Sequence, residues 1–307
     1  PKLAQRAEHL TVFQRTPIWV TPKLDFRMPR AVQTLFARLP RTQRIARTAN
    51  TALLEAIMVA GVLHYRQAKV FNKGAARIAK RHLHQQIADP DLRRKLTPDY
   101  SFGCKRPTFS NDYYPTFTRD DVELETTSIE RITPSGVVTT DGHETEVDAL
   151  VLATGFDMWD ANFPAIEILG RDGKDLGKWW RDTRFQAYQG IAVPGFPNLL
   201  SLASPYSYSG LSYFTTIEAQ MKHMDRLFTE VRRRGAATFE VKDPANEEFL
   251  GWVTERLDNS VFHLGSCATA RSYYFNQHGE AALLRPSSTL NNHKAAVTFP
   301  LEDYAYG

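Results

Sequence analysis

The sequence lacks a glycine-rich phosphate loop. None of its 17 glycines falls into a G-x-G-x-x-G pattern, in which glycines let the backbone and a helix N-terminus approach a pyrophosphate. The chain therefore contains no recognisable cradle for a dinucleotide. With 307 residues, 42% of them hydrophobic, it is still long enough to bury a substantial core and to form two lobes.

Cysteine is scarce as well. The two cysteines, Cys104 and Cys267, stand far apart and belong to no C-x-x-C or histidine-bearing motif. This pattern argues against a disulfide framework and against a zinc site. A reducing cytosol is the simplest compartment, so we expect a cytoplasmic protein without a metal site.

Long apolar runs and a recognisable secretory signal are also missing. The most apolar helical stretch, Thr51 to Leu63, is too short to cross a membrane and contains Glu55. The sequence therefore predicts no membrane span. The first residue is Pro1 and not methionine, so we expect the natural N-terminus to lie upstream.

Positive charge is unevenly distributed. Residues 23–95 carry 16 Lys/Arg and 4 Asp/Glu, a net charge of +12, whereas the whole chain carries +4. Such a segment can attract phosphate-bearing cofactors or an anionic membrane, or it can be a solvated helical face. It lacks aromatic residues interleaved for base stacking, so we expect no nucleic-acid partner. Peripheral membrane contact through residues 23–95 stays open as a secondary feature.

The first hundred residues combine a strand with a long helical region. Leu10 to Gln14 predicts a short buried strand, which Pro17 ends because proline stops regular pairing. From about Pro29 to Lys95, apolar residues recur at three- and four-residue spacings, which predicts helices.

Strands are expected after Pro115. Short candidates separated by turn residues lead into the apolar run from Asp148 to Phe156. That run predicts an interior strand ending in an Ala-Thr-Gly turn, where Gly155 lets the backbone pass close to another group. A further strand is expected at 198–202, and a helix from about Thr215 to Arg234.

Two places carry cations that suit an anionic ligand. Arg15 follows a predicted strand, and in dinucleotide-binding folds an arginine at the end of the second strand pairs with the 2′-phosphate of NADP. Lys105 and Arg106 are adjacent in a loop that contains Gly103. Lysine supplies a point charge there, and arginine supplies directional donors. Taken without context, each of these cations is better explained as an ordinary exposed surface residue.

Taken in order, the motifs resemble those of one family. They are Phe13-Gln14-Arg15-Thr16-Pro17, Gly103-Cys104-Lys105-Arg106, Asp112-Tyr113-Tyr114, Ala153-Thr154-Gly155-Phe156, Pro197-Asn198-Leu199, Ile217-Glu218-Ala219-Gln220, Ser272-Tyr273-Tyr274 and Pro286-Ser287-Ser288-Thr289. Over essentially its whole length the chain is similar to the class B flavoprotein monooxygenases, in particular to the Baeyer–Villiger and bacterial flavin-containing monooxygenases.

The resemblance implies an α/β fold with two Rossmann-like dinucleotide-binding domains for FAD and NAD(P), incomplete at the N-terminus. Residues 1–28 and 96–153 would be the remainder of the NADPH-binding domain. Residues 29–95 would be a basic helical insertion, and 154–307 the C-terminal part of the FAD-binding domain.

The resemblance also assigns roles in binding NADPH and in catalysis. Arg15 and Lys105 would recognise the 2′-phosphate of NADPH, with Thr16 beside them. Arg106 would be the catalytic arginine, a fixed cation near the flavin that stabilises the negatively charged flavin peroxide.

Other residues would lie near the flavin and the substrate. Thr154 and Gly155 would stand at the domain junction near the cofactors. The loop residues that would approach the flavin ring are Ser209, Gly210 and Leu211. Tyr213 and Tyr273 would line a pocket for a small apolar organic substrate, Tyr273 standing where the family often has tryptophan.

The implied reaction uses FAD, NADPH and O₂. NADPH reduces FAD, O₂ adds to the flavin, and one oxygen atom passes to a ketone, which becomes an ester, or to a soft heteroatom. Both glycine loops of the family are absent here. A second interpretation is therefore a truncated, non-catalytic remnant that acts as a binding or interaction module, with the missing N-terminal segment as a partner.

Overall fold

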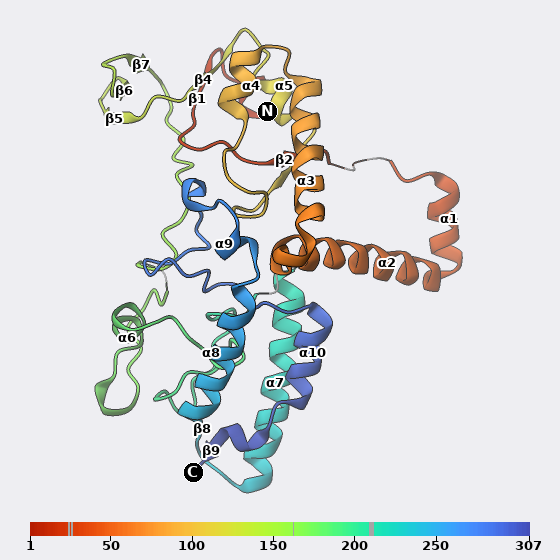
Figure 1. Ribbon diagram of the computed structural model, residues 1–307, viewed down its shortest axis with the longest axis vertical. Helices are drawn as coiled ribbons and strands as arrows, with labels where there is room; N and C mark the ends of the chain where they lie inside the picture. Colours follow the sequence, from red (N-terminus) through yellow and green to blue (C-terminus); the bar gives the residue numbers. More distant parts are fainter. Residues whose placement is uncertain (24, 26, 162, 209–211) are drawn as a thin grey trace. The chain divides into compact units, whose positions relative to one another are not determined.

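The computed structural model describes residues 1–23, 25, 27–161, 163–208 and 212–307 (Figure 1). The chain forms two compact units. Unit 1 contains Pro1–Arg27, Asn72–Phe156 and Ser266–Arg271, and unit 2 contains Met28–Phe71, Asp157–Gly265 and Ser272–Gly307. The helical region expected at 29–95 is thus divided between the units, and the assignment of domains to particular cofactors stays a prediction.

Unit 1 is built around short strand pairs of parallel type. Strand β1 (Leu10–Phe13) pairs with β4 (Val122–Glu125), and β2 (Val20–Thr21) pairs with β3 (Thr108–Phe109). Parallel pairing needs a long connection between the partners, and the helices α3 (Tyr65–Gln86) and α4 (Pro90–Leu96) form part of it. The expected strand at 10–14 is confirmed.

A buried cluster links these elements within unit 1. It contains Val20 from β2, Leu83 from α3, Leu96 from α4 and Leu124 from β4, all less than 9% exposed. In the second half of α3, the apolar residues therefore lie on one face of the helix, and that face is buried. The rest of unit 1 consists of η1 (Leu3–Gln5), α5 (Tyr113–Thr116), η4 (Ala268–Ala270) and an antiparallel sheet in the order β5 (Ile129–Ile132), β6 (Gly136–Thr139), β7 (Glu144–Glu146).

The apolar run from Asp148 to Phe156 is not a strand in the structure. It pairs with no strand among the described residues, and Val151, Leu152 and Phe156 are 65%, 72% and 84% exposed. An extended segment becomes an interior strand only where neighbouring strands satisfy its N–H and C=O groups. The predicted interior strand is therefore wrong. Gly155 has a positive φ of 95°, which favours glycine, but no described group lies within 4 Å of where its Cβ would stand, so the expected close approach is not seen.

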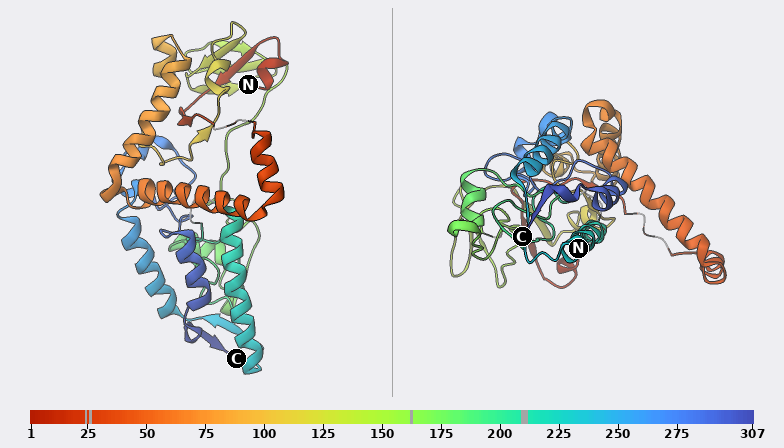
Figure 2. Two further views of the ribbon diagram at one scale, coloured as in Figure 1. Left: turned by 90° about the vertical axis from the view of Figure 1, so that its right-hand side faces the viewer. Right: turned by 90° about the horizontal axis from the view of Figure 1, so that it is seen from below.

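Three helices and a small two-stranded sheet form part of unit 2. Helix α7 (Tyr213–Arg234) confirms the helix expected there, and it ends at Gly235, whose left-handed φ of 64° closes the last turn. Helix α10 (Thr289–Thr298) packs along α7, and α8 (Asp243–Leu257) lies near them (Figure 2). Strands β8 (Phe239–Val241) and β9 (Tyr304–Tyr306) pair antiparallel.

Aromatic side chains dominate the core of unit 2. Trp180 and Phe185 are 2% and 0% exposed, and Trp159 meets Phe185 edge to face with the ring centroids 4.8 Å apart. The strand expected at 198–202 is absent, because this segment forms turns. Its backbone N–H groups donate isolated hydrogen bonds, from Asn198 to Phe239 and from Ser201 to Ile191, and not the repeated bonds of a strand pair. The remaining elements are α1 (Arg30–Arg38), α2 (Pro40–Met58), η2 (Val59–Leu63), η3 (Arg171–Gly173), α6 (Leu176–Asp182), α9 (Val261–Leu264) and η5 (Leu301–Asp303).

Helix α2 continues through η2 as one apolar helix. Together they span the 24 residues Pro40–Leu63, long and apolar enough by length and composition to cross a membrane. The expectation that the apolar stretch is too short is therefore wrong, because the helix extends further toward the N-terminus than residue 51. Length and composition alone do not separate a membrane span from another helix, so the finding carries no conclusion about function.

Candidate functional site

The loop that carries Lys105 and Arg106 is anchored to the segment that follows Arg15. The indole N–H of Trp19 donates to the carbonyl oxygen of Tyr100 at 3.0 Å, and the Tyr100 hydroxyl donates to the carbonyl oxygen of Pro17 at 2.9 Å. Burial raises the pKa of Tyr100 well above its usual value, so its hydroxyl keeps the proton that it donates. These long-range bonds hold the two predicted phosphate-binding segments together.

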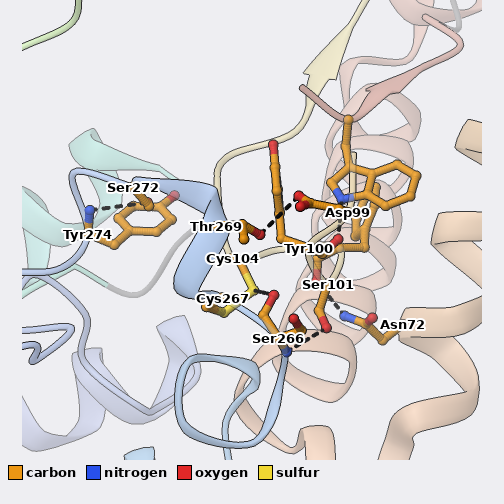
Figure 3. The surroundings of a disulfide bond; sticks show 12 residues. Asn72, Asp99, Tyr100, Ser101, Cys104, Ser266, Cys267, Thr269, Ser272 and Tyr274 are labelled. Atoms are coloured by element: carbon orange, nitrogen blue, oxygen red, sulfur yellow. Dashed lines mark hydrogen bonds between the residues drawn. A yellow bond between two sulfur atoms is a disulfide. The ribbon is translucent and has the colours of Figure 1, made fainter. Parts of the chain in front are cut away.

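A disulfide bond also fixes this loop (Figure 3). It joins Cys104 to Cys267, whose Cα atoms lie 5.3 Å apart, and the two residues are 0% and 8% exposed. The expectation from cysteine spacing is therefore wrong. Distance along the chain says little about distance in a fold, and 163 positions separate these two residues.

Hydrogen bonds surround the disulfide on both segments. The Ser101 N–H donates to the carbonyl oxygen of Ser266 at 2.9 Å, and the Ser266 N–H donates to Oγ of Ser101 at 3.0 Å. The Thr269 hydroxyl donates to Oδ1 of Asp99 at 2.9 Å (Figure 3). Residues 266–271 thus form a clamp on the loop, and both sides of the clamp lie in unit 1.

Arg15 and Lys105 lie close enough for their charges to interact. The pKa of the Lys105 ammonium is lowered, first by burial and then by the positive charge of Arg15. The Lys105 side chain is half-buried, while Arg15 is exposed and the adjacent Thr16 is half-buried. Two repelling cations, one of them partly removed from water, form a site that an anion would stabilise.

Arg106 follows Lys105 in the clamped loop, and its side chain is exposed. Gly103 precedes the pair with a left-handed φ of 94° and is buried, so the turn that presents the two cations requires glycine. The structure thus brings Arg15, Lys105 and Arg106 into one unit. Their roles stay predictions.

The other predicted site residues are more dispersed. Thr154 and Gly155 belong to the exposed run in unit 1, while Tyr213 and Tyr273 belong to unit 2. Tyr213 opens α7 and is 50% exposed, whereas Tyr273 packs edge to face on Tyr274 with the centroids 4.8 Å apart. Three predicted flavin contacts lie outside the described residues: Ser209, Gly210 and Leu211.

Sequence reasoning missed a polar cavity in unit 2. Arg285, His223 and Ser207 line it, and all three are less than 9% exposed. No motif marks these residues; the one available signal was an arginine that follows the apolar run from 281 to 284. Across the described ranges, His, Cys, Asp and Glu side chains form no group of three that could hold a metal ion.

The sequence matches no protein-family model. It is 36% identical over 277 residues to a Baeyer–Villiger monooxygenase of Pseudomonas aeruginosa, covering 90% of this chain and 51% of that protein. It is 30% identical over 308 residues to a Baeyer–Villiger monooxygenase of Streptomyces coelicolor, covering 99% of this chain and 57% of that protein. The chain spans about half the length of the curated relatives that it matches.

A solved structure shows the same fold. The OTEMO complex with FAD and NADP matches with a TM-score of 0.79 at 22% identity, covering 99% of this chain and 63% of that chain. At this level of sequence identity, the structural match is evidence for the fold alone. The fold is the expected α/β fold of flavoproteins with two dinucleotide-binding domains.

Proposed function

Because this chain belongs, over the residues that it spans, to the class B flavoprotein monooxygenases, we propose that it serves an FAD- and NADPH-dependent monooxygenase reaction. The substrate would be a small apolar organic molecule that receives one oxygen atom from O₂. A ketone is the substrate class that the names of the relatives favour, and a soft heteroatom is the alternative. NADPH would supply the hydride, and the flavin would supply the oxygen chemistry.

The observation that carries this proposal is the pairing of Arg15 with Lys105. NADPH differs from NADH by a 2′-phosphate, and the chain offers a guanidinium and an ammonium held near each other for such a group. The guanidinium fork of Arg15 can donate two parallel hydrogen bonds to phosphate oxygens. An anion between the two cations would relieve the repulsion that lowers the pKa of Lys105.

The test of this site uses adenosine 2′,5′-bisphosphate and 5′-AMP, which differ in the 2′-phosphate. We expect Arg15→Ala to weaken binding of the bisphosphate about 10- to 100-fold, because a hydrogen bond to a charged group contributes roughly 1.5–3 kcal/mol. Binding of 5′-AMP should hardly change. Isothermal titration calorimetry of the purified chain measures both constants.

The matched control is Arg119→Ala, an exposed arginine of unit 1 that pairs with Asp121 at 2.6 Å. This variant should bind both nucleotides like the unaltered chain. If Arg15→Ala lost equal affinity for the bisphosphate and for 5′-AMP, the proposed role of Arg15 in recognising the 2′-phosphate would be wrong.

A second candidate function is a non-catalytic binding module. The exposed apolar run from Asp148 to Phe156 favours it, since this run offers side chains and backbone groups to another polypeptide segment. The visible absorbance of the purified chain separates the candidates. Flavin bands at one flavin per chain would support the enzyme. A colourless protein that still binds adenosine 2′,5′-bisphosphate would leave the enzyme reaction to a longer parent chain and would be compatible with the module.

Cellular location belongs to the proposal as well. We place the protein in the cytoplasm, because NADPH and a flavin enzyme would meet there. The scarcity of cysteine no longer supports this location, since Cys104 and Cys267 form a disulfide bond, which is rare in the cytosol. Peripheral membrane contact through residues 23–95 stays a secondary prediction. The exposed Leu35 of α1, Leu39 between α1 and α2, and Ile45 of α2, beside exposed arginines, would suit it. Sedimentation with anionic vesicles, compared with neutral ones, tests that contact.

A further inference from the structure

The two cations of the proposed NADPH site belong to segments that are far apart in the sequence. Arg15 follows strand β1, whereas Lys105 lies in the loop between α4 and β3, and both belong to unit 1. One phosphate group contacts both cations only when their separation brings each within hydrogen-bond distance of its oxygens. The lysine stem is flexible, so the backbones that carry the two side chains must be held at a defined distance.

Tyr100 connects the two segments through its hydroxyl. The residue is 2% exposed, and its hydroxyl donates to the carbonyl oxygen of Pro17, shortly after Arg15, at 2.9 Å. A buried hydroxyl or carbonyl that loses its partner becomes an unsatisfied polar group, which is costly. The fold therefore keeps the backbone that follows Arg15 at hydrogen-bond distance from the Tyr100 ring.

Trp19 makes this connection rigid. Its indole N–H donates to the carbonyl oxygen of Tyr100 at 3.0 Å, and the two rings meet edge to face with the centroids 6.5 Å apart. Trp19 is 5% exposed, and its own carbonyl oxygen accepts from the Thr108 N–H at 2.8 Å, next to the β2–β3 pair. One bond thus runs from Tyr100 to Pro17 and a second from Trp19 to Tyr100. Two bonds in opposite directions prevent one segment from sliding along the other.

A tight turn of residues 101–104 leads from Tyr100 to Lys105. The Cys104 N–H closes the turn by donating to the carbonyl oxygen of Ser101 at 3.1 Å. Both ends of the turn are fixed, the first by hydrogen bonds to the clamp and the last by the disulfide. The backbone that carries Lys105 is therefore held in place relative to Tyr100.

Asn72 of α3 fixes the middle of this turn. Gly103, at the third position, has a φ of 94°, which is typical of a type II turn, but glycine also adopts the negative φ of a type I turn. The two types differ in the direction of the central peptide, here the one between Phe102 and Gly103. Asn72 is 4% exposed, and its Nδ2 donates to the Phe102 carbonyl oxygen at 2.6 Å (Figure 3). This bond selects the type II direction, so the turn keeps one shape.

We propose that Tyr100 is a positioning residue that sets the distance between Arg15 and Lys105 and thereby the affinity of the site for a 2′-phosphate. The inference rests on the proposed function of this pair of cations. Tyr100 acts through Pro17 on one side and through the fixed turn on the other. Without the hydroxyl, the backbone that follows Arg15 is released from the loop, and the two cations no longer meet the same phosphate.

Nucleotide binding to the purified chain gives the first test. Tyr100→Phe removes the hydroxyl and keeps the ring, and we expect it to weaken binding of adenosine 2′,5′-bisphosphate about three- to tenfold, the effect of one hydrogen bond. Binding of 5′-AMP should not change, because this nucleotide lacks the 2′-phosphate. Tyr113→Phe is the matched control, since it also loses a hydroxyl in unit 1, from a ring that packs on Phe117 with the centroids 5.1 Å apart.

A double-mutant cycle shows whether Tyr100 acts through Lys105. In a chain that carries Lys105→Ala, Tyr100→Phe should no longer change the affinity for the bisphosphate, because one of the two cations to be spaced is gone. An equal loss of affinity with and without Lys105 would mean that the hydroxyl acts elsewhere, and the proposal would be wrong.

The protonation of Lys105 reports the spacing without any nucleotide. Burial, and then the positive charge of Arg15, lower the pKa of the Lys105 ammonium. Moving Arg15 away should raise this pKa, so the midpoint at which Lys105 becomes reactive should shift to higher pH in Tyr100→Phe and not in Tyr113→Phe. Trace acetylation at a series of pH values, read by peptide mass spectrometry, measures the midpoint. A midpoint that is unchanged in Tyr100→Phe would overturn the proposal.

A second variant protects the test against a chain that fails to fold. Trp19→Phe removes the indole donor to the Tyr100 carbonyl and keeps an aromatic ring, so it should shift the Lys105 midpoint in the same direction. Failure of the proposed function is recognised separately. If the unaltered chain bound the bisphosphate and 5′-AMP equally, the 2′-phosphate site would be refuted, while the Lys105 midpoint would still decide whether Tyr100 sets the spacing.

Discussion

If the chain serves the proposed monooxygenase reaction, replacing Arg106 by alanine is expected to lower oxygen transfer to the organic substrate by about 100-fold or more while NADPH oxidation continues. Loss of one preorganised donor to a developing negative charge typically costs a factor of 10²–10³. Arg106 follows Lys105 in a loop that hydrogen bonds and a disulfide hold in place. Its guanidinium would therefore meet the reacting groups without the cost of ordering the loop.

The experiment compares product formed with NADPH consumed, in protein loaded with FAD. On the premise of the proposed function, the unaltered protein should form close to one product for each NADPH, whereas Arg106→Ala should release most of the reducing equivalents to oxygen as peroxide. Arg106→Lys keeps the positive charge but loses the forked hydrogen-bond donors of the guanidinium, so it should recover part of the product formed per NADPH. Arg119→Ala again serves as the control. An unchanged ratio of product to NADPH in Arg106→Ala would refute the catalytic role.

The second large effect concerns the bond between Cys104 and Cys267. Reducing it should lower the free energy of unfolding by about 2–4 kcal/mol, because a crosslink between distant positions restricts the unfolded chain. The bond closes a sequence separation of 163 residues, so the restriction is considerable. Urea unfolding with and without a dithiol reductant measures the difference.

A double variant, Cys104→Ala with Cys267→Ala, provides the control for this prediction. It should unfold at the midpoint of the reduced chain and should not respond to reductant. The loop that carries Lys105 also loses its covalent anchor on reduction, so affinity for adenosine 2′,5′-bisphosphate should fall several-fold, limited by the hydrogen bonds that remain. Coincident unfolding curves with and without reductant would show that the bond contributes nothing.

The sequence predicted elements whose local pattern and tertiary surroundings agree. Strand β1 and helix α7 are such cases, since each shows its periodicity and finds a partner in the fold. The run from Asp148 to Phe156 has an equally clear pattern but no neighbouring strand among the described residues, and pattern alone supplies no hydrogen bonds. The segment 198–202 failed for the same reason.

The candidate site was predicted in part, because a sequence motif identifies residue types but not the distant residues that lie beside them in the fold. Arg15 and Lys105 stand in recognisable motifs, and the structure brings their charges near each other. The pairing of Cys104 with Cys267 depends on how residues 266–271 return to unit 1, which spacing does not encode. Arg285 carries no motif, because what distinguishes it is the absence of a carboxylate beside it in the described fold.

The exposed run from Asp148 to Phe156 also bears on how this chain behaves at high concentration. Every residue of the run is exposed, and its backbone amides pair with no strand among the described residues. An extended apolar edge of this kind is a template on which a second molecule can add a strand. The colloidal stability of the chain therefore depends on the apolar side chains of this run, and a charge at Leu152 would protect against aggregation.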